Sequence, residues 1–253
     1  MTSSRPAVLV IGGAWHPPAC YDPLRVRLEA MGYEYYCPQL PSLGAESRGV
    51  TFADDVEAIQ KLAVRLFDQG KEVVIIGHSS GGLLACDVTQ GHEVAQRAKE
   101  GKPGGFRHVI FLAAFFVPAR GMDMLQTLGG AWPDWQIAGE PYTKGHLLRL
   151  KDSAKQKLFS DLPDSEAQRL FESLLPHSQD AFETPSNFIP DDITMPKTYI
   201  ICEKDAILSI ELQKRLIAQS PGFRSESINT GHSPFLTEPD EFAELVKKII
   251  IAD

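Results

Sequence analysis

Residues 72–89 most strongly limit how this chain can fold. A run of mainly β-branched residues, Glu72–Ile76, leads into Gly77-His78-Ser79-Ser80-Gly81, and an apolar stretch typical of a helix follows. This layout predicts a buried strand, a sharp turn that presents Ser79, and a helix that carries the chain away. The glycines around Ser79 let the neighbouring backbone approach without meeting a Cβ atom. The strand and helix on either side distinguish this segment from an ordinary Gly/Ser turn.

Strand-like and helix-like patterns alternate along most of the chain. Short apolar runs predict six strands, at Ala7–Ile11, Tyr33–Cys37, Glu72–Ile76, His108–Ala113, Lys197–Cys202 and Arg224–Ile228. Amphipathic patterns predict the helices between and after them, at Tyr21–Met31, Phe52–Gln69, Ser80–Lys99, Ile210–Gln219 and Pro239–Ile251. Such alternation favours an α/β fold in which a mostly parallel sheet is flanked by helices on both faces.

The middle of the chain interrupts this alternation. Between 118 and 190 the sequence predicts no strand, and helical patterns are found near Ser153–Ser160 and Asp164–Leu175. We therefore expect a core domain formed by residues 1–117 and 191–253, with a helical cap, or lid, formed by residues 118–190. The cap follows the fourth strand and lies over the carboxyl ends of the strands, where open α/β sheets bind ligands.

Composition and charge restrict the function classes. The chain has 253 residues, which suits one α/β domain with an insertion. A net charge of −8 without a basic stripe argues against a nucleic-acid partner. The four cysteines are scattered without CxxC spacing, so we expect no metal site and no cofactor. The first apolar run is too short for a signal peptide or a membrane span, which predicts a cytoplasmic protein without a membrane partner.

A serine hydroxyl needs a base, and the base needs an acid to orient it. When Ser79 comes first in the chain, the expected order is serine, acid, histidine. Of the seven histidines, His232 alone follows the last predicted strand, and Gly231 gives its loop backbone freedom. The acid should follow the strand Lys197–Cys202, where Asp205 and Glu203 compete. We favour Asp205, because it lies further into the loop.

Two backbone N–H groups are expected to stabilise a developing oxyanion. Ser80 follows the nucleophile and begins a helix, so its N–H has no intrahelical partner. The second donor should come from the glycine-rich loop after the first strand, Gly12-Gly13-Ala14-Trp15-His16. The Ala14 N–H is the expected donor, and Gly13 is its competitor.

At this point the chain resembles the α/β-hydrolase superfamily. More narrowly, it is similar to the group of plant methyl esterases, hydroxynitrile lyases and related bacterial and fungal esterases. The residues that carry the resemblance are Gly12-Gly13-Ala14-Trp15-His16, Leu28-Glu29-Ala30-Met31-Gly32-Tyr33, Gly77-His78-Ser79-Ser80-Gly81-Gly82, Tyr199-Ile200-Ile201-Cys202-Glu203-Lys204-Asp205 and Gly231-His232-Ser233-Pro234-Phe235. It implies the strand order 2-1-3-4-5-6, a cap after the fourth strand, the catalytic triad Ser79, Asp205 and His232, and Ala14 and Ser80 as oxyanion donors.

The chain departs from these relatives at several positions. Gly12 stands where the family usually has the histidine that opens the oxyanion loop, and the usual antiparallel edge hairpin is missing or reduced. Hydroxynitrile lyases carry a threonine and a lysine at the positions of Gly13 and Ser233, so lyase activity is not expected. Ser79 also excludes the dehalogenases and epoxide hydrolases of this superfamily, which require an aspartate nucleophile.

These features predict a serine hydrolase that cleaves an uncharged, fairly hydrophobic small carboxylic ester or lactone. Aromatic and imidazole groups near the predicted site are the candidates for substrate binding: Trp15, His16, Phe115, Trp132 and Trp135. The alternatives are a carbon–carbon bond hydrolase or acyltransferase that uses the same triad, and a receptor-like ligand-binding protein with slow turnover. The small-molecule substrate is the expected partner, and the sequence leaves the oligomeric state open, a homodimer included.

Overall fold

A six-stranded parallel sheet forms the centre of the structure, a computed structural model that describes residues 5–252. Its strands are β1 (Ala7–Ile11), β2 (Tyr35–Tyr36), β3 (Glu72–His78), β4 (Gly105–Leu112), β8 (Lys197–Cys202) and β9 (Phe223–Ile228). Their order across the sheet is β2-β1-β3-β4-β8-β9, and every pair is parallel. This confirms the predicted order 2-1-3-4-5-6, with β8 and β9 as the fifth and sixth strands.

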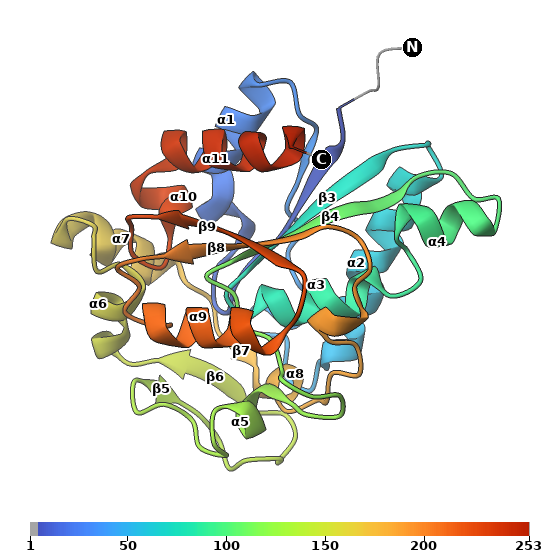
Figure 1. Ribbon diagram of the computed structural model, residues 1–253. Helices are drawn as coiled ribbons and strands as arrows, with labels where there is room; N and C mark the ends of the chain where they lie inside the picture. The colour runs from blue at the N-terminus through green and yellow to red at the C-terminus, as the bar shows by residue number, and fades with distance from the viewer. Residues whose placement is uncertain (1–4, 253) are drawn as a thin grey trace.

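Helices cover both faces of this sheet (Figure 1). The helices outside the middle segment are α1 (Asp22–Ala30), α2 (Phe52–Phe67), α3 (Gly81–Thr89), α4 (Val94–Lys99), α9 (Ile210–Gln219), α10 (Pro234–Thr237) and α11 (Pro239–Ile251). In Figure 1, α1 and α11 lie above the sheet, and α2, α3 and α9 lie below it. Short 3₁₀ helices cover Pro18–Tyr21, Asp152–Ala154 and Pro190–Asp192.

Side chains along the central strands point alternately to the two faces of the sheet, which explains why two helical layers are needed. In β1, Leu9 and Ile11 pack in the core on the side of α2 and α3, whereas Val8 and Val10 pack on the side of α1 and α11. Neighbouring side chains of a strand point to opposite faces, so an entirely apolar strand must be buried on both. The continuous apolar runs of the sequence are therefore the interior strands of the sheet.

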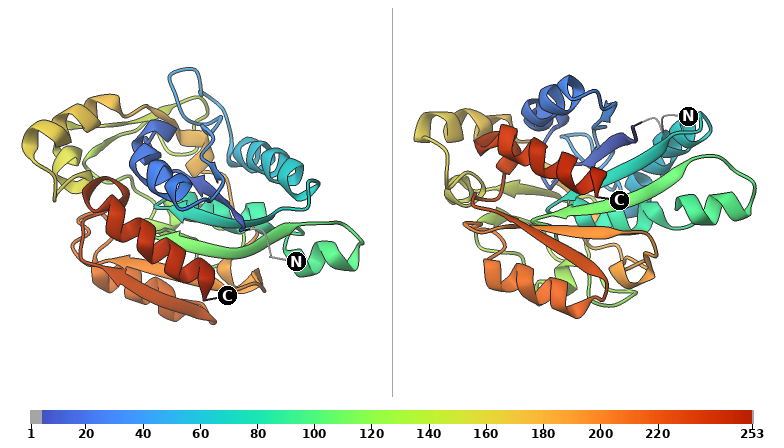
Figure 2. Two further views of the ribbon diagram at one scale, coloured as in Figure 1. Left: turned by 90° about the horizontal axis from the view of Figure 1, so that it is seen from above. Right: turned by 45° about the horizontal axis from the view of Figure 1, so that its top comes forward.

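Residues 118–190 lie next to the ends toward which β8 and β9 point (Figures 1 and 2). This segment contains α5 (Met124–Thr127), α6 (Lys155–Leu158), α7 (Asp164–Ser173) and α8 (Gln179–Phe182). It also contains a second, antiparallel sheet in the order β5-β6-β7, formed by Gln136–Ile137, Leu147–Leu150 and His177–Ser178. The prediction that the segment has no strands is therefore wrong. Strands of two to four residues are too short to produce a readable period.

Two further predictions need correction. The segment Ser80–Lys99, which the sequence predicts to be mostly helix, forms two separate helices, because Gly91 has φ +75° and Glu93 is the extended residue that starts α4. A residue with positive φ cannot continue a right-handed helix. The strand predicted at Tyr33–Cys37 is reduced to Tyr35–Tyr36 at the sheet edge.

Candidate active site

Ser79 lies on a strained turn at the end of β3. Its φ is +52°, in a region that non-glycine residues seldom adopt. Three hydrogen bonds hold this backbone: the Ser79 N–H donates to the Leu112 carbonyl (3.1 Å), and the Ser79 carbonyl accepts from the N–H groups of Phe115 (2.9 Å) and Gly82 (3.0 Å). The flanking glycines are sterically required, since a Cβ on Gly81 would lie 2.5 Å from the Ile11 carbonyl oxygen. The turn is therefore built against the ends of β1 and β4.

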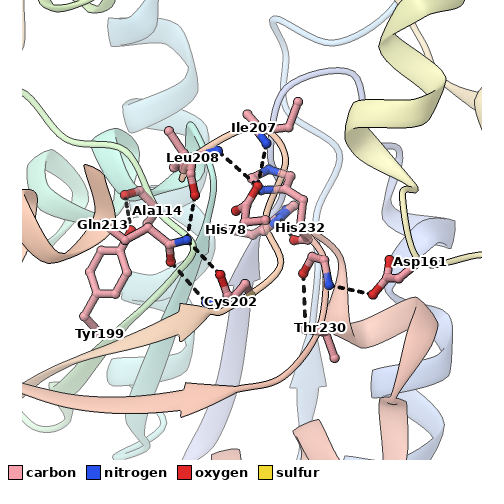
Figure 3. A network of polar contacts seen from close by, with 12 residues as sticks. His78, Ala114, Asp161, Tyr199, Cys202, Ile207, Leu208, Gln213, Thr230 and His232 are labelled. Carbon is pink, nitrogen blue, oxygen red and sulfur yellow. Dashed lines mark hydrogen bonds and ion pairs between the residues drawn. The ribbon is translucent and has the colours of Figure 1, made fainter. Parts of the chain in front are cut away.

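His232 and Asp205 form a buried pair on the two loops that follow β9 and β8. His232 Nδ1 lies 2.7 Å from Asp205 Oδ2, and both side chains are almost completely buried. The other carboxylate oxygen accepts hydrogen bonds from the N–H groups of Ile207 (2.7 Å) and Leu208 (3.0 Å), as Figure 3 shows. Asp205 thus fixes the ring orientation of His232 and leaves Nε2 to exchange a proton. Glu203 instead accepts a hydrogen bond from Ser227 at the surface.

His78 connects the histidine loop with the loop after β1. The His78 ring lies beside His232 (Figure 3), and its Nε2–H donates to the His232 carbonyl at 3.0 Å. The Tyr21 hydroxyl donates to His78 Nδ1 at 2.8 Å and accepts from the Gly13 N–H at 2.8 Å. The direction of each of these hydrogen bonds is fixed, because the Gly13 backbone N–H at one end can only donate and the His232 carbonyl at the other can only accept. Sequence reasoning missed Tyr21, which had no recognisable motif.

The hydrogen bond to Tyr21 separates the two candidate oxyanion donors of this loop. Gly13 uses its N–H for Tyr21, whereas within residues 5–252 neither the Ala14 N–H nor the Ser80 N–H donates to a protein acceptor. The loop comes close to Ser79, the predicted nucleophile, since a Cβ on Gly13 would lie 3.0 Å from the Ser79 Cβ atom. Ala14 and Ser80 thus retain the free donors that an oxyanion requires.

The residues predicted to bind substrate fall into different environments. Trp15 packs with Ala14, Leu148 and Phe182, and Trp132 and Trp135 pack against this cluster. The Trp15 and Trp135 rings meet edge to face at 5.7 Å. Phe115 packs instead in the large core cluster on the α2 and α3 side of the sheet.

His16 lies beside the same loop, and its ring centroid is 5.6 Å from that of His78. Its Nδ1–H donates to the Ala14 carbonyl at 2.7 Å, whereas Nε2 is buried without a hydrogen-bond partner among the described residues. Burial lowers the pKa of His16 to about 4 and that of His78 well below its ordinary value. Both rings are therefore neutral at pH 7.

Three further features of the described residues concern metal ligation, the cysteines and membrane spans. Within residues 5–252, no group of three or more His, Cys, Asp or Glu side chains is arranged to hold a metal ion. The four cysteines are free thiols. No helix in this part of the chain is long and apolar enough to span a membrane.

Comparison with known proteins places the chain in a family. The model of the alpha/beta hydrolase family matches residues 8–245, and the chain therefore belongs to this family. An alpha/beta hydrolase of Aspergillus novofumigatus, nvfD, is 26% identical over 246 residues, covering 96% of each chain. Methylesterase 1 of Arabidopsis thaliana is 23% identical, covering 95% of this chain and 94% of its own.

Solved structures agree with the fold. A pyrethroid hydrolase of Sphingobium faniae superposes with a TM-score of 0.74 at 21% identity, over 98% of both chains. Polyneuridine aldehyde esterase superposes with a TM-score of 0.78 at 18% identity, over 98% of this chain and 100% of its own. The resemblance to the α/β-hydrolases, and within them to the methyl esterases, is confirmed.

Replacing Tyr21 with Phe tests the chain that joins the loops. The change leaves the Gly13 N–H and His78 Nδ1 buried without a partner, which should lower the free energy of unfolding by about 1–3 kcal/mol. Urea denaturation measures the loss. Tyr36→Phe is the matched control, because the Tyr36 hydroxyl donates to Glu34 at the surface and its removal should change little. Equal stability of both variants and the wild type would contradict the role given to Tyr21.

The buried neutral histidines predict that stability falls with acidification. Burial lowers the pKa of His16 to about 4 and of His177 to about 3, and His78 is lowered as well. Their stabilising effect is complete above about pH 6.5 and is lost as the pH falls toward these native values, because only the unfolded chain binds the protons. Each pH unit costs up to about 1.4 kcal/mol per histidine.

Asp55 opposes this effect, since burial raises its pKa to about 6 and the native state then binds a proton first. Burial also lowers the pKa of His92 and raises that of Asp87, so four histidines act in one direction and two carboxyls in the other. This balance still predicts a lower unfolding free energy at pH 5 than at pH 7.5. Urea denaturation at the two pH values measures the difference, and equal or higher stability at pH 5 is the contrary result.

Proposed function

We propose that the protein is a serine esterase that hydrolyses uncharged, fairly hydrophobic small carboxylic esters or lactones through an acyl-serine intermediate. One observation carries this proposal: the buried His232 and Asp205, with Nδ1 and Oδ2 2.7 Å apart, follow the carboxyl ends of the strands, as the strained Ser79 turn does. Ester hydrolysis is also consistent with the relatives, among which are esterases and a pyrethroid hydrolase.

The proposed reaction uses backbone and side-chain groups of the chain alone. Ser79 Oγ attacks the substrate carbonyl carbon while His232 Nε2 takes its proton, and Asp205 stabilises the resulting imidazolium. The Ala14 and Ser80 N–H groups donate to the oxyanion of the tetrahedral intermediate. When this intermediate collapses, His232 returns the proton to the leaving alcohol. Water then attacks the acyl-serine with the same base, which releases the acid and restores Ser79.

Side chains around the Ala14 loop support a hydrophobic substrate. Trp15, Trp132 and Trp135 belong to an apolar group of side chains in contact with Ala14. The Trp132 indole N–H is buried and has no acceptor among the described residues. An apolar wall with a single unpaired donor suits an uncharged ligand with one further acceptor oxygen, such as an ether or a second ester.

We further propose that residues 118–190 act as the lid over this site. Leu148 on β6 and Phe182 on α8 come from that segment and form one hydrophobic cluster with Ala14 and Trp15. The same segment reaches the histidine loop, where the exposed Asp161 carboxylate accepts a hydrogen bond from the Gly231 N–H at 2.6 Å (Figure 3). It therefore contacts the loops that carry both the oxyanion donor and the base.

Replacing Ser79 with Ala should abolish turnover of p-nitrophenyl butyrate. Loss of the nucleophile from a catalytic triad lowers kcat by about 10³-fold or more. Ser80→Ala is the matched control, because it keeps the backbone N–H that is assigned to the oxyanion and should keep most of the activity. Wild-type turnover by the Ser79→Ala protein would refute the assignment of the nucleophile.

The acid can be tested by comparing its two candidates. Asp205→Asn should lower kcat by about a hundredfold or more, because the amide no longer stabilises the His232 imidazolium. Glu203→Gln should leave kcat nearly unchanged, because Glu203 bonds to Ser227 at the surface. Steady-state kinetics on the same ester measure both, and a larger loss in the Glu203 variant would reverse the assignment.

Substrate panels separate the proposal from its alternatives. Turnover of esters or lactones but not of β-diketones supports ester hydrolysis, whereas preferential cleavage of β-diketones indicates a carbon–carbon bond hydrolase. Transfer of the acyl group to an added alcohol in preference to water indicates an acyltransferase. A fluorophosphonate probe that fails to label Ser79 would favour a receptor-like protein.

A further inference from the structure

A second buried chain of polar side chains lies outside the proposed catalytic triad. Asp55 on α2, Ser42 on the loop before it and His177 on β7 come from three separate segments, and none is more than 2% exposed. Buried polar groups are costly unless they are hydrogen-bonded, so such a cluster has to be satisfied internally. The mechanism proposed above uses none of these residues.

The hydrogen bonds that join Asp55, Ser42 and His177 have one consistent direction. Asp55 accepts from both the Ser42 N–H, at 2.9 Å, and the Ser42 hydroxyl. His177 Nε2 lies 2.7 Å from Ser42 Oγ. Since the hydroxyl proton is given to Asp55, the oxygen accepts from the His177 Nε2–H. His177 Nδ1 then carries the lone pair.

That lone pair accepts the backbone N–H of Trp15 at 3.3 Å. The pKa of His177 is lowered to about 3 by burial, so the ring stays neutral and Nδ1 remains an acceptor. Asp55 thus determines, through Ser42, which ring nitrogen of His177 faces Trp15. The carboxylate–hydroxyl–imidazole order fixes a tautomer in the way that a carboxylate does in a catalytic triad.

Trp15 needs such support, because its φ is +66°. A bulky residue in this region costs about 1–3 kcal/mol and persists only where its surroundings hold it. The Trp15 carbonyl accepts from the Leu175 N–H at 2.9 Å, and its indole N–H donates to the Leu148 carbonyl at 3.2 Å. Together with the bond to His177, these contacts anchor Trp15 entirely on residues 118–190. Ala14, which supplies the proposed oxyanion donor, is the preceding residue.

Ser80, the residue of the second proposed oxyanion donor, lies near the same buried side chains. Asp55 and His177 line a cavity of about 10 Å³ together with Ser80. The hydrogen-bonded group of Asp55, Ser42 and His177 therefore contacts the residue after Ala14 and shares a cavity wall with Ser80. Its position suits a role in holding the Ala14 and Ser80 N–H groups at a fixed separation.

We propose that His177 is a positioning residue for catalysis: oriented by Ser42 and Asp55, it holds the Trp15 backbone and thereby aims the Ala14 N–H at the oxyanion. This inference rests on the proposed ester hydrolysis. His177 acts through Trp15 and takes no proton during the reaction. Its loss should therefore weaken transition-state binding more than substrate binding.

Two substitutions of His177 separate hydrogen bonding from packing. His177→Phe keeps an aromatic ring and removes both hydrogen bonds, and we expect kcat to fall about tenfold or more while KM changes by less than about threefold. In His177→Asn the amide oxygen can take the place of Nδ1 and accept the Trp15 N–H, which should restore part of the loss. His146→Phe makes the same exchange at another histidine of residues 118–190 and should leave kcat unchanged.

Binding of a transition-state analogue is a readout that a merely structural role would not change. An alkyl boronic acid forms a tetrahedral adduct with an active serine and places an oxygen in the oxyanion hole. Its affinity for His177→Phe should fall by the same factor as kcat, whereas inhibition by the acid product should be unaltered. Wild-type kcat and boronate affinity in a folded His177→Phe protein would overturn the proposal.

Further measurements keep the two proposals distinguishable. If His177→Phe does not fold, Ser42→Ala tests the proposal instead, because this change keeps the His177 ring but removes the hydrogen bond that fixes its tautomer. A wild-type kcat in the Ser42→Ala protein would then overturn the proposal. If the wild-type protein reacts with a fluorophosphonate probe at Ser79 but hydrolyses no ester, the proposed function fails. The ratio of labelling rates of the wild type and His177→Phe then tests the positioning role alone, and equal rates overturn it. A wild-type protein that neither labels nor hydrolyses overturns both.

Discussion

The buried imidazole of His78 is the contact on which the arrangement of the candidate site depends. It accepts from the Tyr21 hydroxyl and donates to the His232 carbonyl, and Tyr21 in turn accepts from Gly13. Burial keeps the ring neutral, and a neutral ring has one donor and one acceptor. If His78 were protonated, Nδ1 could no longer accept from Tyr21. The nucleophile turn, the histidine loop and the loop after β1 therefore share one pattern of hydrogen bonds.

The parts of this site that follow chain order could be predicted from the sequence. Ser79 is the predicted nucleophile because a strand and a helix flank its glycine-rich turn, and His232 is the predicted base because it follows the last strand. The choice of Asp205 over Glu203 followed from its place in the loop, and the structure pairs it with His232. The strand order came from the family resemblance and is confirmed by the sheet. These features are local, or they are fixed by the order of elements in a parallel sheet.

The parts that depend on contacts between distant segments could not be predicted. Trp15 and His177 are separated by 162 residues, and no pattern in the sequence indicates that a backbone N–H of one meets the ring of the other. Asp55 was the exception, since it lies on the apolar stripe of α2 between Phe52 and Ile59. A carboxylate on a buried helix face requires a partner, and this signal alone could have pointed to the second polar chain.

Two strained residues flank the candidate site, and the structure stabilises them by the same means. Ser79 and Trp15 both have positive φ, and in each the backbone N–H and carbonyl are both hydrogen-bonded. For Ser79, Leu112 and Phe115 lie at the end of β4, the interior strand next to β3, and Gly82 lies at the start of α3. For Trp15 both partners lie in residues 118–190, whose elements are short helices and two- to four-residue strands.

The two halves of the candidate oxyanion hole therefore have unequal support. A displacement of residues 118–190 would break the hydrogen bonds of Trp15 and leave those of Ser79 intact, because Ser79 and Ser80 depend on the sheet. Short elements with few ladder hydrogen bonds are also the parts of a fold that open at the lowest free energy. The backbone next to Ala14, rather than the Ser79 turn, is thus the part of the candidate site that is hydrogen-bonded to residues 118–190.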